Sequence, residues 1–246
     1  MSMSGARIGA VIRKELAEFR RNRLIITSAS IFPILFLVEP TALILTTRAQ
    51  RGSSSTMLDA RVEASLFVPL LIPVLVPALL SAYAVVGERE QGTLEPVLTT
   101  PIGRIELLIG KAAAIFIPAV AVSYLIFGVF FAITQLAASP AVAAAVLHSP
   151  QLPAGLVFIP LLAAWAIWVG LAVSARSTDT RVAQQLSVLG SLPPAAVAAL
   201  MSFKVISPTF GLVAALAVAL LAIDCAACLA VARLFDRERL VTGPQH

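Results

Sequence analysis

The chain has 246 residues, of which 59% are hydrophobic and only 13% are charged, and its formal net charge is +5. A soluble domain has about 25% charged residues, so this composition excludes a protein that is surrounded by water over most of its surface. Continuous apolar runs of about 20 residues are each long enough to cross a membrane as a helix. A β-barrel would show shorter, alternating segments, so the sequence predicts an all-α polytopic membrane protein.

The N-terminal segment, residues 1–23, precedes the first apolar run and is basic. One helical stripe of this segment carries its apolar residues, which are Ile8, Val11, Ile12, Leu16 and Phe19. Most of its charged residues lie off that stripe. This pattern favours a cytoplasmic amphipathic helix that lies at the membrane interface. A soluble cytoplasmic helix or a frayed tail is the alternative.

Six apolar runs bounded by charged residues or by Pro, Ser and Gly clusters predict a six-span transmembrane domain over residues 24–232. The spans are expected at about 24–47, 64–86, 108–137, 155–175, 182–203 and 206–232, followed by a tail at 233–246. Pro69, Pro73 and Pro77 predict a kink in the second span. In the fifth, Ser191–Pro194 (SLPP) kinks or breaks a helix unless neighbouring groups satisfy the freed carbonyls; two half-helices with a re-entrant segment are the alternative.

The distribution of basic residues predicts the orientation of the chain across the membrane. Residues 1–23, 87–111, 176–181 and 233–246 hold fourteen of the 18 Lys and Arg residues, and the opposite side holds the other four. Because Lys and Arg accumulate in cytoplasmic segments, both termini and the polar loop after the second span are expected in the cytoplasm.

That polar loop, Gly87–Pro101 (GEREQGTLEPVLTTP), lies between two uncharged segments. Glu88, Arg89 and Glu90 are expected in water or against protein, and Gly92 is expected to turn the chain. Thr93 suits a helix N-cap, Glu95 and Pro96 suit the first turn, and Pro101 ends the helix, which leaves Leu94, Val97 and Leu98 on a small apolar face. A helix of one or two turns is unstable alone in water, so it must dock on the membrane or on a cytoplasmic partner.

Two acids lie inside predicted spans, where a charge is costly. Glu39 is about 24 Å along the first span from Arg23, which favours a side chain that reaches the outer interface over a polar group at an outer gate. Asp224 lies in the cytoplasmic half of the last span. A structural contact between helices and a role in transport are equally open for it.

The remaining motifs predict architecture and no catalysis. Gly103–Ala112 (GRIELLIGKA) does not have the spacing of a phosphate-binding loop, and Lys111 is expected among lipid headgroups. Cys225 and Cys228 are interpreted as small packing residues, with no metal site. Ala166, Gly170 and Ser174, spaced four residues apart, predict close packing between helices.

Gly87–Ile102 resembles the cytoplasmic signature of ABC-2 type permeases, whose pattern is close to E-R-E-x-G-T-L-E-x-L-L-x-x-P. The matching residues are Glu88, Arg89, Glu90, Gly92, Thr93, Leu94, Glu95, Leu98 and Pro101, with Val97 in place of the first Leu of the pair. Ser174–Ser187 is similar to a second polar loop of the family and contributes Arg176, Asp179, Arg181, Gln184 and Gln185. Arg233–Leu240 is similar to the ending of the same group.

The resemblance implies a permease subunit in a bacterial plasma membrane, whose short helix after Gly92 couples it to a cytoplasmic ABC ATPase. It implies a homodimer or heterodimer of permeases in the lipid bilayer, export, no nucleic acid partner, no catalysis, and no cofactor bound by this chain, with ATP and Mg held by the ATPase. The short turn at residues 203–208 departs from members with large substrates such as sterols. An ATP-independent channel or secondary transporter, or a non-transporting assembly factor, is the alternative.

Overall fold

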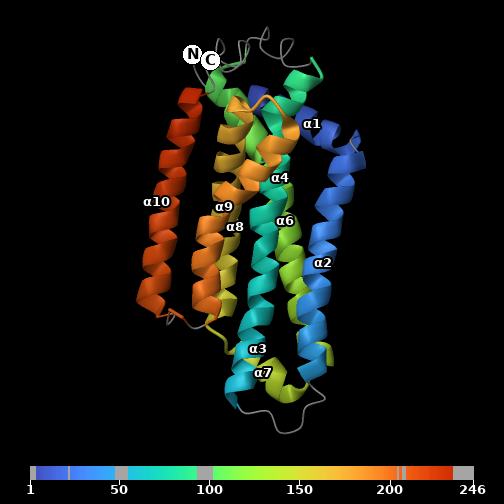
Figure 1. The fold of residues 1–246 in the computed structure, drawn as a ribbon, viewed down its shortest axis with the longest axis vertical. Coiled ribbons are helices and arrows are strands. Elements are labelled where there is room, and N and C mark those ends of the chain that lie inside the picture. Colours follow the sequence, from blue (N-terminus) through green and yellow to red (C-terminus); the bar gives the residue numbers. More distant parts are fainter. Residues whose placement is uncertain are drawn as a thin grey trace.

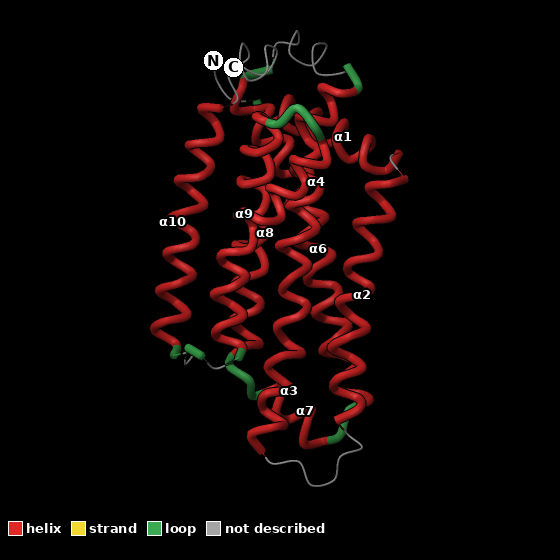
Figure 2. Tube along the Cα trace, in the orientation of Figure 1, coloured by secondary structure: helices red, strands yellow, loops and turns green. Residues whose placement is uncertain are grey.

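The computed structural model describes residues 4–21, 23–47, 55–92, 102–203, 205–206 and 209–234. Every regular element in these ranges is a helix (Figure 1, Figure 2). In chain order the elements are α1 (Gly5–Arg21), α2 (Arg23–Thr47), α3 (Ser55–Phe67), the 3-10 turn η1 (Val68–Leu71), α4 (Ile72–Glu90), α6 (Arg104–Ala137), α7 (Pro140–Leu147), α8 (Gln151–Arg176), α9 (Thr180–Ser202) and α10 (Phe210–Leu234).

The long helices run side by side in an elongated bundle (Figure 1). One end, called here the α1 end, carries α1, the last turn of α4 and the junction between α8 and α9. The carboxyl end of α10 lies at the same end, whereas α3 and α7 lie at the opposite end. The last turn of α4 and the α8–α9 junction, which belong to the two predicted cytoplasmic polar loops, therefore lie at one end of the molecule.

Among the described residues, five helices are long and apolar enough to cross a membrane: Ala60–Glu90, Arg104–Ala137, Gln151–Arg176, Thr180–Ser202 and Phe210–Leu234. They correspond to the second to sixth predicted spans, and the chain is a multi-pass membrane protein. The first predicted span coincides with α2, in which Ser30–Thr46 forms a shorter apolar helix. Two helices were not predicted: α3, which extends the second span at its amino end, and the short α7.

Helix α4 is the most buried of the spanning helices and packs most closely on α8. A Cβ atom added to Gly170 would lie only 1.7 Å from Ser81 Oγ, so glycine is what allows the two backbones to approach. Nearby, Ser174 Oγ accepts hydrogen bonds from the backbone N–H groups of Val85 and Val86, both at 3.0 Å. The predicted packing role of this α8 stripe is confirmed.

The prolines of the second span change its helix type locally. Pro69 lies at the start of η1, the 3-10 turn that joins α3 to α4, and Pro73 lies in the first turn of α4. Pro77 lies inside α4. A proline lacks the N–H that an α-helix needs, so the irregularity is local while the helical path continues. The predicted distortion of this span is thus a 3-10 turn.

Helix α9 runs without a break through Pro193 and Pro194, so the alternative of two half-helices with a re-entrant segment is wrong. Because Pro194 has no N–H, the Gly190 carbonyl four residues earlier loses its helical partner. Trp165 of α8 supplies one instead, since its Nε1 donates to Gly190 O at 3.1 Å. A neighbouring side chain thereby satisfies the freed carbonyl and keeps the helix continuous.

Helix α1 packs on α6 at the α1 end. Val11, from the predicted apolar stripe, is 4% exposed, and a Cβ atom on Gly110 of α6 would lie 2.6 Å from Val11 Cβ. Ile8, Ile12, Leu16 and Phe19 are half-buried, and Arg13 and Arg21 are exposed. Part of the apolar stripe therefore faces protein, and the interfacial position of the helix stays a prediction.

Candidate functional site

The predicted coupling loop begins in the last turn of α4, which contains Glu88, Arg89 and Glu90. Gly92 follows with φ of +68°, a left-handed conformation that favours glycine, and its N–H donates to Arg89 O at 3.1 Å. The helix therefore ends where the sequence predicts a turn. The other predicted coupling residues, Thr93, Leu94, Glu95, Val97, Leu98 and Pro101, lie outside the described residues.

Arg89 reaches across to the carboxyl end of α8. Its guanidinium nitrogens lie 2.8 Å from Ser177 O and 3.5 Å from Ala175 O. The last carbonyls of a helix have no partner within the helix and carry its partial negative charge, so a cation is favourable there. Arg89 thus joins the last turn of α4 to the end of α8.

Glu90 makes the complementary contact with the next helix. Its Oε1 accepts a hydrogen bond from the backbone N–H of Thr180, the first residue of α9, at 3.0 Å. Asp179 caps the same end, since its Oδ1 accepts from the N–H groups of Arg181 and Val182 at 2.7 and 3.0 Å. Carboxylates at a helix amino end match its partial positive charge. Arg89 and Glu90, called here the bracket, hold α4 to both sides of the α8–α9 junction.

The other residues predicted in the second polar loop lie around this junction. Arg176, the last residue of α8, is exposed, as are Arg181 and Gln185 of α9, while Gln184 is half-buried. The structure therefore brings both predicted polar loops together at one end of the bundle. Their exposed side chains leave a basic and polar surface beside the bracket.

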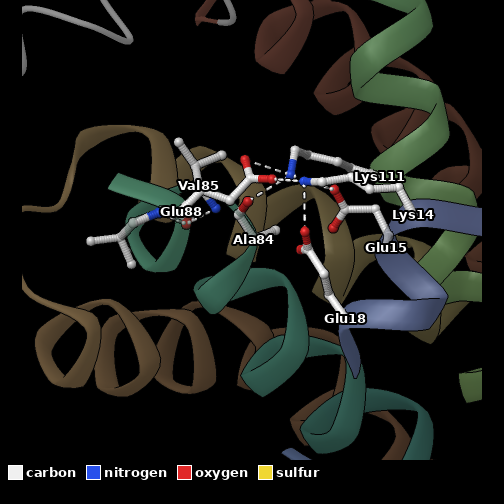
Figure 3. A network of polar contacts seen from close by, with 9 residues as sticks. Lys14, Glu15, Glu18, Ala84, Val85, Glu88 and Lys111 are labelled. Atoms are coloured by element: carbon white, nitrogen blue, oxygen red, sulfur yellow. Dashed lines mark hydrogen bonds and ion pairs between the residues drawn. The ribbon is translucent and has the colours of Figure 1, made fainter. Parts of the chain in front are cut away.

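Glu88 points the other way, into a cluster of charges at the α1 end, in which Glu15, Glu88 and Lys111 are buried (Figure 3). Its Oε2 lies 2.9 Å from Lys111 Nζ of α6, and Lys111 Nζ is also 2.8 Å from Glu15 Oε1 of α1 and 2.8 Å from Ala84 O of α4. The Lys14 ammonium donates to Glu88 as well. We call Lys14, Glu15, Glu18, Glu88 and Lys111 the charge cluster.

The position of Lys111 corrects the sequence-based expectation. It was expected among lipid headgroups, but its side chain is only 1% exposed and is held between two carboxylates. A buried cation needs opposite charges and hydrogen bonds to offset the loss of water, and α1 and α4 provide both. Lys111 is therefore an internal connector between three helices.

Two ammonium groups lie among the three carboxylates of the cluster and offset most of their charge. Glu15, Glu18 and Glu88 place carboxylate oxygens within 4.8 Å of one another, and Lys14 and Lys111 bind among them. Burial by itself lowers the pKa of Lys14, but the carboxylates of Glu15 and Glu88 outweigh this effect and raise its pKa above the ordinary value. Lys14 is therefore fully protonated at neutral pH.

A second polar contact ties the start of α1 to α6. Glu106, which is 3% exposed, accepts from the backbone N–H of Ser4 and of Gly103, both at 2.8 Å. Arg7 lies 3.3 Å from Glu106 Oε2. Together with the charge cluster, this contact fixes α1 on α6 and α4 along most of its length.

Sequence reasoning missed Glu15, Glu106 and the true place of Lys111. Glu106 and Lys111 are charges next to or within an apolar segment, and such a charge usually has a partner in the protein. That signal was present in the sequence for Lys111, which lies inside the third apolar run. The identity of its partner could not be read from the sequence, because Glu15 and Lys111 are separated by 96 residues.

The two acids predicted inside spans, Glu39 and Asp224, differ in their surroundings. Glu39 is exposed on α2, among the exposed apolar residues Leu35 and Val38. Asp224 is 5% exposed on α10, and neither of its carboxylate oxygens has a hydrogen-bond partner among the described residues. A buried carboxylate without such a bond gives no support to the structural contact considered from the sequence.

The geometry thus joins two polar loops, a set of membrane helices and a docked α1 at one end of the molecule. A search of curated proteins finds no significant match to the chain. The family model described as ABC-2 family transporter protein matches residues 9–193, which include most of α1, the bracket, the charge cluster and most of α9. Because this match covers most of the sequence, the chain belongs to the ABC-2 family of transporter proteins.

Proposed function

We propose that the chain is the permease subunit of an ABC exporter. A second permease copy completes the translocation path, and separate cytoplasmic ATPases hydrolyse ATP. The family match supports this proposal, since membrane domains of the family are transporter parts and are not themselves catalytic. Export is adopted by analogy with the family. ATP and Mg are expected in the partner ATPase alone.

In the proposed topology α2 is the first span, which brings the number of spans to six, and the α1 end faces the cytoplasm. An even number of spans places both ends of the spanning domain on one side, and α1 and the end of α10 do lie at the same end of the bundle (Figure 1). The excess of Lys and Arg in the segments at this end supports the same orientation. We place the protein in the bacterial plasma membrane on the family resemblance.

The bracket is the observation that carries the coupling proposal. We infer that residues 93–101 form the coupling helix and dock in a cleft of the ATPase. Arg89 and Glu90, directly before this segment, bond to the end of α8 and the start of α9. A push on the loop would therefore act on three spanning helices at once, and Glu88 extends the connection to α6 and α1. A rigid attachment of this kind allows a movement of the ATPase to be transmitted to the spanning helices.

The test uses the full chain in lipid nanodiscs and its candidate ABC ATPase. Leu94→Ala removes one of the two leucine side chains from the proposed docking face. Since a hot-spot residue at the centre of an interface is worth about 2 kcal/mol or more, we expect at least a 30-fold loss of ATPase affinity. Leu136→Ala is the matched control, because Leu136 is 88% exposed and lies at the opposite end of α6.

Equal ATPase affinity for Leu94→Ala and the wild type would show that residues 93–101 are not the docking segment. A channel or secondary transporter would give a different result again. It would transport in response to an ion gradient in the absence of any ATPase. An assembly factor would show neither ATP-driven nor gradient-driven transport.

A further inference from the structure

A cavity of about 280 Å³ lies in the half of the bundle away from the α1 end. Helices α9 and α10 both pack on α8 but make little contact with each other over the described residues. The cavity occupies the space between them. Its floor is the first half of α8, its walls are α9 and α10, and Leu70 of η1 closes it on one side.

The lining of this cavity is almost entirely apolar. It contains Phe158 and Trp165 of α8, Pro194 and Val197 of α9, and Leu216 of α10, and none of its described lining residues is charged. Such a surface packs against hydrocarbon without burying a polar group, and it offers no counter-ion for an ionic ligand. The cavity therefore suits an aliphatic group and excludes a highly polar molecule such as a sugar chain.

One polar group lies at the start of α8. The side-chain nitrogen of Gln151 is buried, and it has no hydrogen-bond partner among the described residues. A buried donor without an acceptor is unfavourable by about 1 to 3 kcal/mol, so this amide favours a ligand that brings an oxygen. An ester carbonyl next to a hydrocarbon chain has that combination.

The place where the cavity opens indicates which occupant can enter it. Several lining residues, including Ala219 and Ile223 of α10, are also exposed, so the cavity opens on the side of the bundle that the bilayer surrounds.

We propose that this cavity binds one acyl chain of a lipid from the bilayer, with the ester carbonyl accepting a hydrogen bond from Gln151. The inference needs only the membrane location of the helices and is independent of the coupling to an ATPase. Occupancy by lipid fills the space between α9 and α10 and holds α10 at its distance from α9. This would make the lipid a structural part of the bundle.

Trp165 provides a direct probe, because it lines the cavity and the chain has only two tryptophans. The Trp168→Phe variant leaves Trp165 as the sole indole. The purified full chain in detergent micelles is titrated with phosphatidylcholine that carries bromine on one acyl chain, which quenches indole fluorescence on contact. We expect quenching of Trp165 that saturates at a low mole fraction of lipid and is reversed by unbrominated phosphatidylcholine.

Two pairs of variants in the Trp168→Phe background locate the binding. Ala198→Phe and Ala154→Phe fill the cavity from α9 and α8 and are expected to weaken saturable quenching at least fivefold. Ala196→Phe and Val157→Phe are the matched controls, since both positions are exposed on the same helices outside the cavity lining. Gln151→Leu is expected to weaken binding by about 2- to 10-fold, the range for one hydrogen bond. Circular dichroism and gel filtration confirm that each variant is folded.

Two outcomes would overturn the proposal. In the first, Trp165 quenching rises in proportion to the brominated lipid and is equal in the cavity-filling variants and their controls, which indicates bulk lipid only. In the second, the cavity-filling variants change the oligomeric state but leave quenching unaltered, which indicates that a second copy covers this face. Failure of either kind leaves the coupling proposal untouched, because Leu94→Ala is tested through ATPase affinity.

Discussion

Lys111 Nζ lies 2.9 Å from Glu88 Oε2, and these side chains are only 1% and 6% exposed. This ion pair joins α6 to the last turn of α4, directly before the bracket. Glu15 of α1 binds the same ammonium, so one cation connects three helices. A buried ion pair adds little net stability compared with apolar residues, but it fixes which groups face each other. We interpret the pair as the element that sets the position of α4 against α6 and α1.

Replacing Lys111 with methionine should destabilise the protein strongly. The change leaves Glu15 and Glu88 buried with Lys14 as the remaining cation of the cluster, and breaking a buried pair costs up to about 3 to 5 kcal/mol. Adding Glu88→Gln to the same chain removes one of the excess negative charges and should recover part of the loss. Thermal unfolding in detergent measures both, with Arg13→Ala, an exposed position on α1, as the control. A melting temperature of Lys111→Met equal to that of the wild type would contradict this account.

Arg89→Lys should impair communication along the bracket without affecting ATPase binding. Lysine keeps the charge but cannot direct two donors at Ser177 O and Ala175 O as a guanidinium does. Hydrogen bonds of this kind contribute about 1.5 to 3 kcal/mol, so we expect roughly a tenfold smaller stimulation of ATP hydrolysis by the permease. The measurement compares ATPase rates with and without the chain.

A parallel loss of ATPase affinity in Arg89→Lys would instead assign Arg89 to the docking surface. Arg20→Ala serves as the control, because Arg20 is an exposed cation on α1 at the same end. Normal stimulation together with normal affinity would remove Arg89 from the coupling path altogether.

The apolar runs predicted the long helices because a segment of about 20 apolar residues has few other stable states in a bilayer. The predicted second span, 64–86, corresponds to a longer helix, Ala60–Glu90, in the structure. This helix also includes polar residues at both ends, such as Arg61 and Glu90. Hydropathy counts such charged residues against a span, so the predicted span ended at the edge of the apolar core. The extra helix α3 was missed for the same reason.

The bracket and the charge cluster show what one sequence could not reveal. Glu88 was expected in water or against protein, and its partner Lys14 is 74 residues away along the chain. Nothing in the local pattern around Glu88 or Lys14 specifies that pairing. The turn at Gly92 could be predicted because a local residue type determines it. A conformation that depends on the local residue type could therefore be predicted from the sequence, whereas a contact between residues far apart in the chain could not.

Trp165→Phe should destabilise α9 through the carbonyl of Gly190. Phenylalanine keeps most of the ring but has no N–H, so the carbonyl that Pro194 leaves free loses its donor. Leaving a buried acceptor unpaired costs about 1 to 3 kcal/mol. In a double-mutant cycle, Pro194→Ala restores a backbone donor for Gly190 O and should reduce the effect of Trp165→Phe. Additive changes in melting temperature would mean that this hydrogen bond does not stabilise the helix.

Gly170→Ala should disturb the closest contact between α8 and α4. The new Cβ would lie 1.7 Å from Ser81 Oγ and 2.7 Å from Ser81 Cβ, so rotation of the serine side chain cannot relieve the clash. Overpacking of this kind typically costs about 1 to 3 kcal/mol, measured as a lower melting temperature. Gly128→Ala on α6 is the matched control, because its Cβ meets no atom within 4 Å and alanine favours a helix over glycine by about 0.5 to 1 kcal/mol. Ser81→Gly in the Gly170→Ala chain removes the side chain that clashes and should restore stability. Equal stability of Gly170→Ala and Gly128→Ala would instead show that α4 and α8 can separate without a loss of stability.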